Sequence, residues 1–257
     1  MRIIYNFNFK IIIMEIPLYF YTAYRDLERL SPGSNQTTLK ALDKIDVNHD
    51  EELNILDIAC GVGSSTILLA NYFKNSTVEG FDLFKHYKQI LDEKISENDL
   101  ADRVFAYQMD MRDPDFANEE FDIVFCEAGI EIIGFKKGLD EWKRLLKSNG
   151  YMIVSDVSWL KKPSKESRDF WTSTYGEIDT VENKMEQIQD FDYEFIDYVV
   201  VPKSEWDEYH LNLEKNLNLL NNDKSAQDFA GQLKKEIKTY RQNSNDYSYV
   251  FYIMRKV

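Results

Sequence analysis

Apolar residues occur along the chain in two alternating patterns. Short apolar runs bounded by polar or turn residues are typical of buried strands, and stretches with an apolar residue every three or four positions are typical of helices. Strands and helices that alternate in this way favour an α/β fold with a mainly parallel sheet. The strand-like runs cover residues 53–56, 77–82, 104–109, 121–126, 151–155, 193–201 and 247–253.

Helix-like stretches lie between these runs. The longest helical region covers residues 203–243, with helix start signals at Ser204 and Ser225. An insertion of this kind just before the last strand is suited to cap a site at the edge of the sheet. The other predicted helices cover residues 19–30, a segment through 39–42 that follows the turn at 31–34, and residues 84–97, 135–146, 164–175 and 181–189.

The first strand-like run leads into a turn that carries a chemical signal. After Asp57 come small residues at alternate positions, Ala59, Gly61 and Gly63, and then a Ser-Ser-Thr sequence that opens a helix. Such a strand, turn and helix lie at the carboxyl edge of a parallel sheet, where ligands bind. Glycine suits the turn because the backbone must bend sharply and a Cβ would collide with an approaching ligand.

Two acidic residues indicate which ligand this turn binds. A dinucleotide site needs a third small residue after Gly63, which the sequence Gly-Val-Gly-Ser-Ser-Thr lacks. Asp57 would repel a pyrophosphate and attract an ammonium or sulfonium group. Asp82 ends the second strand, about 20 residues beyond the glycines, where an acid accepts hydrogen bonds from both ribose hydroxyls. Together these residues predict a nucleoside ligand with a positively charged tail.

Composition limits the classes of partner. The chain has 257 residues, of which 44% are hydrophobic, so one α/β domain can bury a full core. A formal net charge of −14 argues against a nucleic acid or an anionic membrane surface, because phosphate contacts need clustered Lys and Arg. Cys60 and Cys126 are expected to be free thiols of a cytoplasmic protein rather than a disulfide.

The order of the motifs resembles class I S-adenosylmethionine-dependent methyltransferases. Residues 57–63, Asp-Ile-Ala-Cys-Gly-Val-Gly, are similar to the family's Asp/Glu-x-Gly-x-Gly-x-Gly, with Ala59 in place of the first glycine. The resemblance covers residues 53–157, and residues 249–253 are similar to the closing strand of the small-molecule-type subgroup. It implies a Rossmann-like α/β fold: a seven-stranded, mostly parallel sheet with the last strand antiparallel, helices on both faces and a helical cap insertion.

The resemblance also implies a set of residues that bind S-adenosyl-L-methionine. In the family, a carboxylate at the position of Asp110 bonds the adenine amino group and the next backbone amide, that of Met111, reaches a ring nitrogen. The alternative is that Asp110 only belongs to a polar turn around Pro114. The implied cofactor residues are Asp57, Ala59, Gly61, Gly63, Asp82, Leu83, Asp110, Met111 and Glu127.

Glu127 is the candidate catalytic residue. It follows the fourth strand, which in the family lies beside the transferable methyl group, so it is expected to orient the acceptor or take its proton. The alternative is a structural carboxylate that caps backbone N–H groups. A metal site made by Glu127, Asp110 and Asp156 lacks histidine and paired-acid spacing, so no metal is predicted.

Aromatic residues outside the motifs are candidates for an acceptor pocket. The resemblance suggests that Phe20, Tyr21 and the turn at 31–34 close over the cofactor, although this segment could instead cover a sheet edge. Singly, each of the other aromatic residues is ordinary packing; as a group they indicate an aromatic-walled pocket. The predicted substrate pocket comprises Phe20, Tyr21, Trp159, Trp171 and Trp206.

The domain prediction separates a short extension from one large domain. Residues 1–14 are interpreted as an extension, with Met14 as a possible start, because their apolar run is too short to span a bilayer; a signal peptide is the alternative. The domain covers 15–257, with helical insertions at about 158–190 and 203–246.

The functional prediction is a methyltransferase that moves a methyl group from S-adenosylmethionine to a small molecule by in-line displacement. The expected partner is this small-molecule acceptor, without nucleic acid or membrane, and a homodimer is possible. The alternatives are a protein methyltransferase, which would need an open groove, and a non-catalytic module that only binds the nucleoside.

Overall fold

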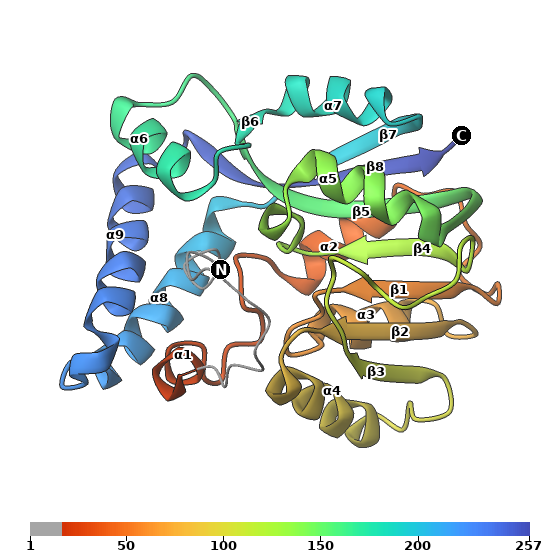
Figure 1. Cartoon of the computed structure of the whole chain (residues 1–257), viewed down its shortest axis with the longest axis horizontal. Coiled ribbons are helices and arrows are strands. Elements are labelled where there is room, and N and C mark those ends of the chain that lie inside the picture. Colours follow the sequence, from red (N-terminus) through yellow and green to blue (C-terminus); the bar gives the residue numbers. More distant parts are fainter. Residues whose placement is uncertain (1–16) are drawn as a thin grey trace.

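A mostly parallel sheet forms the centre of the molecule. The computed structural model describes residues 17–257, so the predicted extension over residues 1–14 lies outside the described residues. The eight-stranded sheet has the order β3-β2-β1-β4-β5-β8-β7, with β6 paired to β5 (Figure 1). The strands are β1 (Asn54–Ile58), β2 (Thr77–Asp82), β3 (Val104–Gln108), β4 (Phe121–Cys126), β5 (Leu146–Trp159), β6 (Asp179–Thr180), β7 (Tyr193–Val200) and β8 (Tyr247–Lys256).

Strand direction confirms the expected class of fold. β8 runs antiparallel to both of its neighbours, β5 and β7, whereas the pairs among β1 to β5 are parallel. The short β6, which lies off the main path of the sheet, was not predicted. The carboxyl ends of β1, β2 and β4 therefore meet at one edge, and the glycine turn lies there.

Helices cover both faces of the sheet and bury two separate cores. Neighbouring residues of β1 point to opposite faces, so that Ile55 belongs to one core and Leu56 to the other. Each fully buried aliphatic side chain contributes roughly 1.5 to 3 kcal/mol. The helices on one face are α2 (Asn35–Leu42), α3 (Ser64–Tyr72) and α4 (Lys85–Glu97), and those on the other are α5 (Phe135–Trp142) and α7 (Val181–Asp190).

A helical cap lies beside the sheet. It consists of α1 (Leu18–Ala23), α6 (Lys165–Thr174), α8 (Lys203–Leu219) and α9 (Gln227–Asn243) (Figure 1). A third core of apolar side chains joins α1 to α8 and α9; within it the rings of Phe20 and Phe229 lie 5.7 Å apart. The insertion that the sequence indicated before the last strand is thus packed against the N-terminal segment.

Two predicted helices end earlier than the sequence pattern suggested. The first stops at Ala23, because Asp26 has a φ of 57°, which an α-helix cannot accommodate. The chain from residue 24 to residue 33 therefore crosses the edge of the sheet as an irregular segment. The helix predicted over 135–146 ends at Trp142, and β5 already begins at Leu146, so Asn149 and Gly150 lie within a strand instead of ending a helix.

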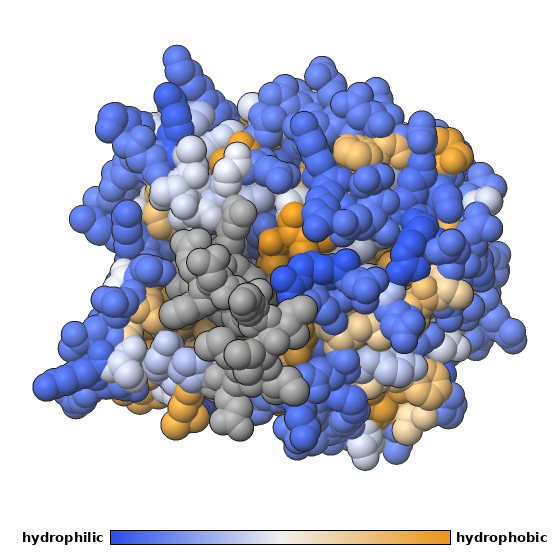
Figure 2. Space-filling view, in the orientation of Figure 1, coloured by the Kyte–Doolittle hydropathy of each residue, from blue (hydrophilic) through white to orange (hydrophobic). Residues whose placement is uncertain are grey.

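The surface is mainly hydrophilic. On the face drawn in Figure 2, hydrophilic residues predominate and apolar residues form small, separate groups. Across residues 17–257, no helix combines the length and the apolar character that crossing a bilayer would require.

Candidate active site

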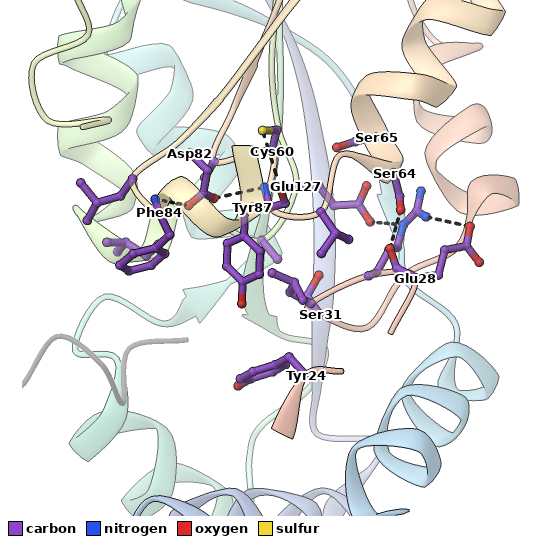
Figure 3. A pocket seen from close by; sticks show the side chains of 18 of the residues that line it. Tyr24, Glu28, Ser31, Cys60, Ser64, Ser65, Asp82, Phe84, Tyr87 and Glu127 are labelled. Carbon is purple, nitrogen blue, oxygen red and sulfur yellow. Dashed lines mark hydrogen bonds and ion pairs between the residues drawn. The ribbon is translucent and has the colours of Figure 1, made fainter. Parts of the chain in front are cut away.

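A hollow of about 750 Å³, including its open mouth, lies at the carboxyl ends of β1, β2 and β4. The tips of these strands form its floor, and the irregular segment that contains Tyr24, Arg29 and Ser31 covers it. Figure 3 shows side chains from both parts facing the same space. This is the edge at which the sequence predicted a ligand.

Left-handed backbone conformations shape the turn after β1. Ala59, Gly61 and Gly63 have φ values of 58°, 52° and 80°. A Cβ on Gly61 would lie 3.0 Å from Leu30 of the covering segment, and one on Gly63 would lie 2.5 Å from Leu91 of α4. Gly61 therefore keeps the hollow open, whereas Gly63 allows α3 and α4 to pack closely.

Asp82 ties the tip of β2 to this turn. Its Oδ2 accepts a hydrogen bond from the backbone N–H of Gly61 at 3.1 Å, and its Oδ1 accepts one from that of Phe84 at 3.0 Å (Figure 3). Burial raises the pKa of Asp82 to about 6, although these N–H groups favour the ionised form. Since each carboxylate oxygen has two lone pairs, both oxygens can still accept from a ligand in the hollow.

Asp57 lies on the same face of the sheet but deeper. It pairs with Gly80, two residues before Asp82, so both carboxylates point to one side. Its Oδ2 accepts hydrogen bonds from Ser65 Oγ at 2.7 Å and Thr66 Oγ1 at 2.6 Å. The side chain is fully buried beneath the first turn of α3, outside the set of residues that line the hollow. Burial raises the pKa of Asp57 to about 7.

A buried ion pair joins Glu127 at the tip of β4 to the covering segment. Glu127 Oε1 accepts a hydrogen bond from Arg29 Nε at 2.9 Å, and its Oε2 accepts one from Thr38 Oγ1 at 3.1 Å. The Arg29 and Glu127 side chains are only 8% and 7% exposed. A Cβ on Gly33 would lie 2.5 Å from Glu127 Oε1, so glycine lets the segment pass closely. Glu127 therefore holds the cover of the hollow in place.

Comparison with known proteins agrees with this geometry. Residues 55–150, which include the glycine turn and strands β1 to β4, match a family described as a methyltransferase domain. The match covers less than half of the 257 residues, so this stretch of the chain is similar to a methyltransferase domain. The fold of the chain is that of a solved S-adenosylmethionine-dependent methyltransferase from Thiobacillus denitrificans in complex with S-adenosyl-L-homocysteine; the TM-score is 0.79 at 16% identity, over 95% of this chain and 100% of the other.

Curated relatives match this chain over about half of its length or less. An uncharacterized protein of Haemophilus influenzae is 31% identical over 134 residues, which is 50% of this chain and 51% of the relative. A demethylmenaquinone methyltransferase of Bacteroides fragilis is 26% identical over 105 residues, which is 40% of this chain and 43% of the relative. The chain thus spans about half the length of the curated relatives it matches, or less.

The methyltransferase fold brings most of the predicted cofactor residues to the hollow and leaves the others outside it. Asp110 forms an ion pair with Arg112, whose Nε donates to Asp110 Oδ1 at 2.9 Å. Burial alone would raise the pKa of Asp110, but the hydrogen bonds and charge of Arg112 lower it below its usual value. Asp110, Asp57 and Gly63 do not line the hollow, whereas Ala59, Gly61, Asp82, Leu83, Met111 and Glu127 do.

A second hollow adjoins the first, and the two share Leu30, Ser31 and Ala128. Of the predicted substrate residues, Trp171 and Trp206 line the second hollow and Phe20 lines the first.

Two other predicted pocket residues lie elsewhere in the methyltransferase fold. Trp159 lines neither hollow and packs edge-on against Tyr247, with ring centroids 6.1 Å apart. Tyr21 packs against His86, with ring centroids 4.4 Å apart, beside a separate surface depression. Both side chains pack against neighbouring rings. Aromatic character in the sequence therefore did not distinguish packing residues from pocket residues.

Sequence reasoning missed two charged residues at the hollows, Arg29 and Glu131. Glu131 follows β4 in a short 3-10 turn, is only 4% exposed and lines the second hollow. Arg29 lies in the covering segment; its Nη1 makes no hydrogen bond among the described residues but lies 3.7 Å from Glu28 Oε1. Neither belongs to a motif of the methyltransferase family. An acid inside the apolar run Gly-Ile-Glu-Ile-Ile was the only signal for Glu131.

The three acids weighed as a metal site each have a cationic partner instead. Asp110 pairs with Arg112, and Glu127 pairs with Arg29. Asp156 accepts a hydrogen bond from the buried Lys184 Nζ. Within residues 17–257, no group of three or more His, Cys, Asp or Glu side chains is arranged to hold a metal ion.

Proposed function

We propose that this protein is an S-adenosylmethionine-dependent methyltransferase that acts on a small molecule. The observation that carries the proposal is the junction of the two hollows. One is bounded by the glycine turn and Asp82, the other is walled by aromatic residues, and they meet at Ala128 and Ser31. A donor in the first hollow and an acceptor in the second would therefore face each other across this junction.

The proposed donor site assigns a role to each end of the ligand. Asp82 accepts from the ribose hydroxyls, since both of its oxygens keep a free lone pair at the hollow. Met111 and Leu83 line the adenine end. Arg29 Nη1, which has no hydrogen-bond partner in the described chain, binds the carboxylate of the methionine part. Asp57 acts through its field from below the turn rather than by contact.

The chemistry is an in-line displacement. When bound, the donor supplies an activated methyl group, whose carbon accepts the lone pair of the acceptor while the electrons of the carbon–sulfur bond remain on sulfur. The residues of this chain align the two ligands and exclude water, effects that can supply roughly 7 to 11 kcal/mol. The Arg29–Glu127 pair contributes by holding the covering segment closed over the junction. This favours the positioning role of Glu127 over proton transfer.

The cap supports a small acceptor rather than a protein chain. Helices α6, α8 and α9 supply side chains that wall the second hollow, including Trp171 and Trp206, which are 6% and 1% exposed. A peptide would need an open groove at this place. A cytoplasmic location and a homodimer stay predictions.

Calorimetry with S-adenosylmethionine and S-adenosylhomocysteine tests the donor site. We expect both to bind, and we expect Asp82→Asn, which keeps the shape of the side chain, to weaken binding by about 1.5 to 3 kcal/mol because a charged hydrogen-bond acceptor is lost. Asp102→Asn, at an exposed position, is the matched control. Absence of binding to the unaltered protein would remove the proposal.

A screen of small acceptors, followed by mass measurement of the products, tests catalysis. A methylated small molecule supports the enzyme. Tight donor binding without any methylated product would instead favour a module that only binds the nucleoside, and methylation of proteins alone would favour the protein methyltransferase.

A further inference from the structure

The second hollow has an aromatic wall. It measures about 1150 Å³ including its open mouth. Its lining comes from α6, α8 and α9 of the helical cap, from β8 and from the segment that leads out of β4. Its aromatic side chains are Phe170, Trp171, Tyr175, Trp206, Tyr209 and Tyr249.

A buried carboxylate lies within this wall. Glu131 is 4% exposed, and its Oε1 accepts a hydrogen bond from Tyr249 Oη at 2.9 Å. Its Oε2 is buried and has no hydrogen-bond partner among the described residues. A buried carboxylate oxygen without a partner is costly, so a ligand that donates to it would offset that cost.

No cation inside the hollow neutralises Glu131, as far as the described residues show. Lys235 is the only lysine or arginine among the lining residues, and it is exposed at the rim, 5.9 Å from the ring of Phe170. Glu236 adds a second carboxylate, which lies 3.3 Å from His210 Nε2. The nearby cation Lys184 is bound to Asp156, outside the lining.

We propose that the second hollow binds an organic cation, a methyl acceptor whose protonated amine has Glu131 as its counter-ion, while a different atom of the molecule supplies the lone pair that takes the methyl group. The aromatic rings would hold the cation through their negative faces as well as the hydrocarbon part through apolar contact. A carboxylate or phosphate ligand would be repelled by Glu131 and Glu236. A neutral ligand would gain no charge attraction from Glu131. The inference rests on the proposed function, because it names the acceptor of the same site.

Matched probes that share a ring and a two-carbon chain and end in a cationic, neutral or anionic group test this inference on the full chain. One set is phenylethylamine, phenylethanol and phenylpropionate, and a larger set is tryptamine, tryptophol and indolepropionate. Each is titrated calorimetrically, with and without saturating S-adenosylhomocysteine. We expect the amine of at least one set to bind about tenfold more tightly than its neutral and acidic counterparts, a difference of about 1.4 kcal/mol.

Two conservative variants locate the preference. Glu131→Gln keeps the volume and removes the charge, so the amine preference should fall to about threefold or less. Glu208→Gln, at an exposed position of α8, should leave the preference intact. Tyr249→Phe, which removes the donor to Glu131 Oε1, provides a second measurement if Glu131→Gln proves unstable, and it should alter the amine affinity more than that of the neutral probe.

The outcomes for the two proposals are separable. Equal or tighter binding of the neutral or acidic probes, no binding by either amine, or an amine preference that survives Glu131→Gln overturns the inference. If S-adenosylhomocysteine still binds in those cases, the donor part of the proposed function stands. If it does not bind, the proposed function fails, and the amine titrations without it still decide the role of Glu131.

Discussion

The two hollows are built in different ways. The first is made by strand tips and backbone amides within the sheet, with Gly61 and Asp82 separated by only 21 positions. The second is made by side chains that reach it from the cap, from β8 and from the segment after β4. Two of them, Tyr249 of β8 and Glu131, are 118 positions apart. A short motif is therefore sufficient to specify the first hollow, whereas the second depends on how distant segments pack.

This difference has a functional counterpart. A family that uses one donor with many acceptors needs a constant donor site and a variable acceptor site. Backbone geometry at a sheet edge is hard to change without unfolding the sheet, while side chains on an added helical cap can vary with little effect on it. The boundary between the two is the covering segment, which Arg29 attaches to Glu127.

Breaking the ion pair between the covering segment and Glu127 should have the largest effect on stability. In Arg29→Leu, the buried Glu127 loses its cation, and we expect the free energy of unfolding to fall by about 3 to 5 kcal/mol. Urea denaturation measures this. Arg25→Leu, at an exposed position of the same segment, is the control; equal losses in both variants would mean that the ion pair does not hold the cover.

The left-handed backbone of the turn after β1 can be tested at Gly63. Valine there would need a left-handed conformation and would bring its Cβ to 2.5 Å from Leu91 Cδ1. We expect Gly63→Val to cost about 3 kcal/mol of unfolding free energy from strain and overpacking. Gly231→Ala is the contrasting change, because a Cβ there meets nothing within 4 Å. It should stabilise α9 by up to about 1 kcal/mol, as urea denaturation would show.

Two buried acids, Asp57 beside the first hollow and Glu131 in the second, oppose folding when they are ionised. Burial raises the pKa of Asp57 to about 7, and burial together with the charge of Asp156 raises that of Glu131 to about 7. The folded chain therefore keeps protons that the unfolded chain has already lost. The free energy of unfolding should fall as pH rises from about 4.5 to 7.5, by about 3 kcal/mol for each group.

Thermal and urea unfolding of the ligand-free protein across this pH range would measure the slope. Asp57→Asn should remove the contribution of Asp57 to this pH dependence. Glu131→Gln should remove the contribution of Glu131. If neither variant flattens the slope, the carboxylates are ionised at all these pH values and the reasoning fails. Lower pH is avoided, because Asp110 and Asp246, whose pKa values are lowered, would then lose stabilising charge.

The smallest expected effect on the free energy of unfolding comes from a single hydrogen bond in the wall of the second hollow. Tyr249→Phe removes the hydroxyl that donates to Glu131 Oε1, and we expect a loss of about 0.5 to 1.5 kcal/mol in urea denaturation. Tyr198 on β7 is 42% exposed, so Tyr198→Phe should change stability little. A larger loss for Tyr198→Phe would show that the hydrogen bond is not what stabilises this wall.

The sequence by itself determined most of the sheet and the edge at which the first hollow lies. β4 has the predicted bounds, and Asp82 lies at the tip of β2 beside Gly61, because strand periodicity and turn chemistry are local properties of the chain. It also indicated the cap before the last strand. It did not indicate that the first helix would end at Ala23, shortly before the left-handed residue Asp26.

Only the tertiary structure decided which charges face the hollows. Asp57 has the sequence position of a ligand contact, but Ser65 and Thr66 fold back on it and bury it. Asp110 turns to Arg112, and Arg29 meets Glu127 across 98 positions of the chain. A charged side chain pairs with any suitable partner within reach, so these pairings depend on which residues are close in space. The pattern along a strand or helix indicates only how residues close in sequence are arranged.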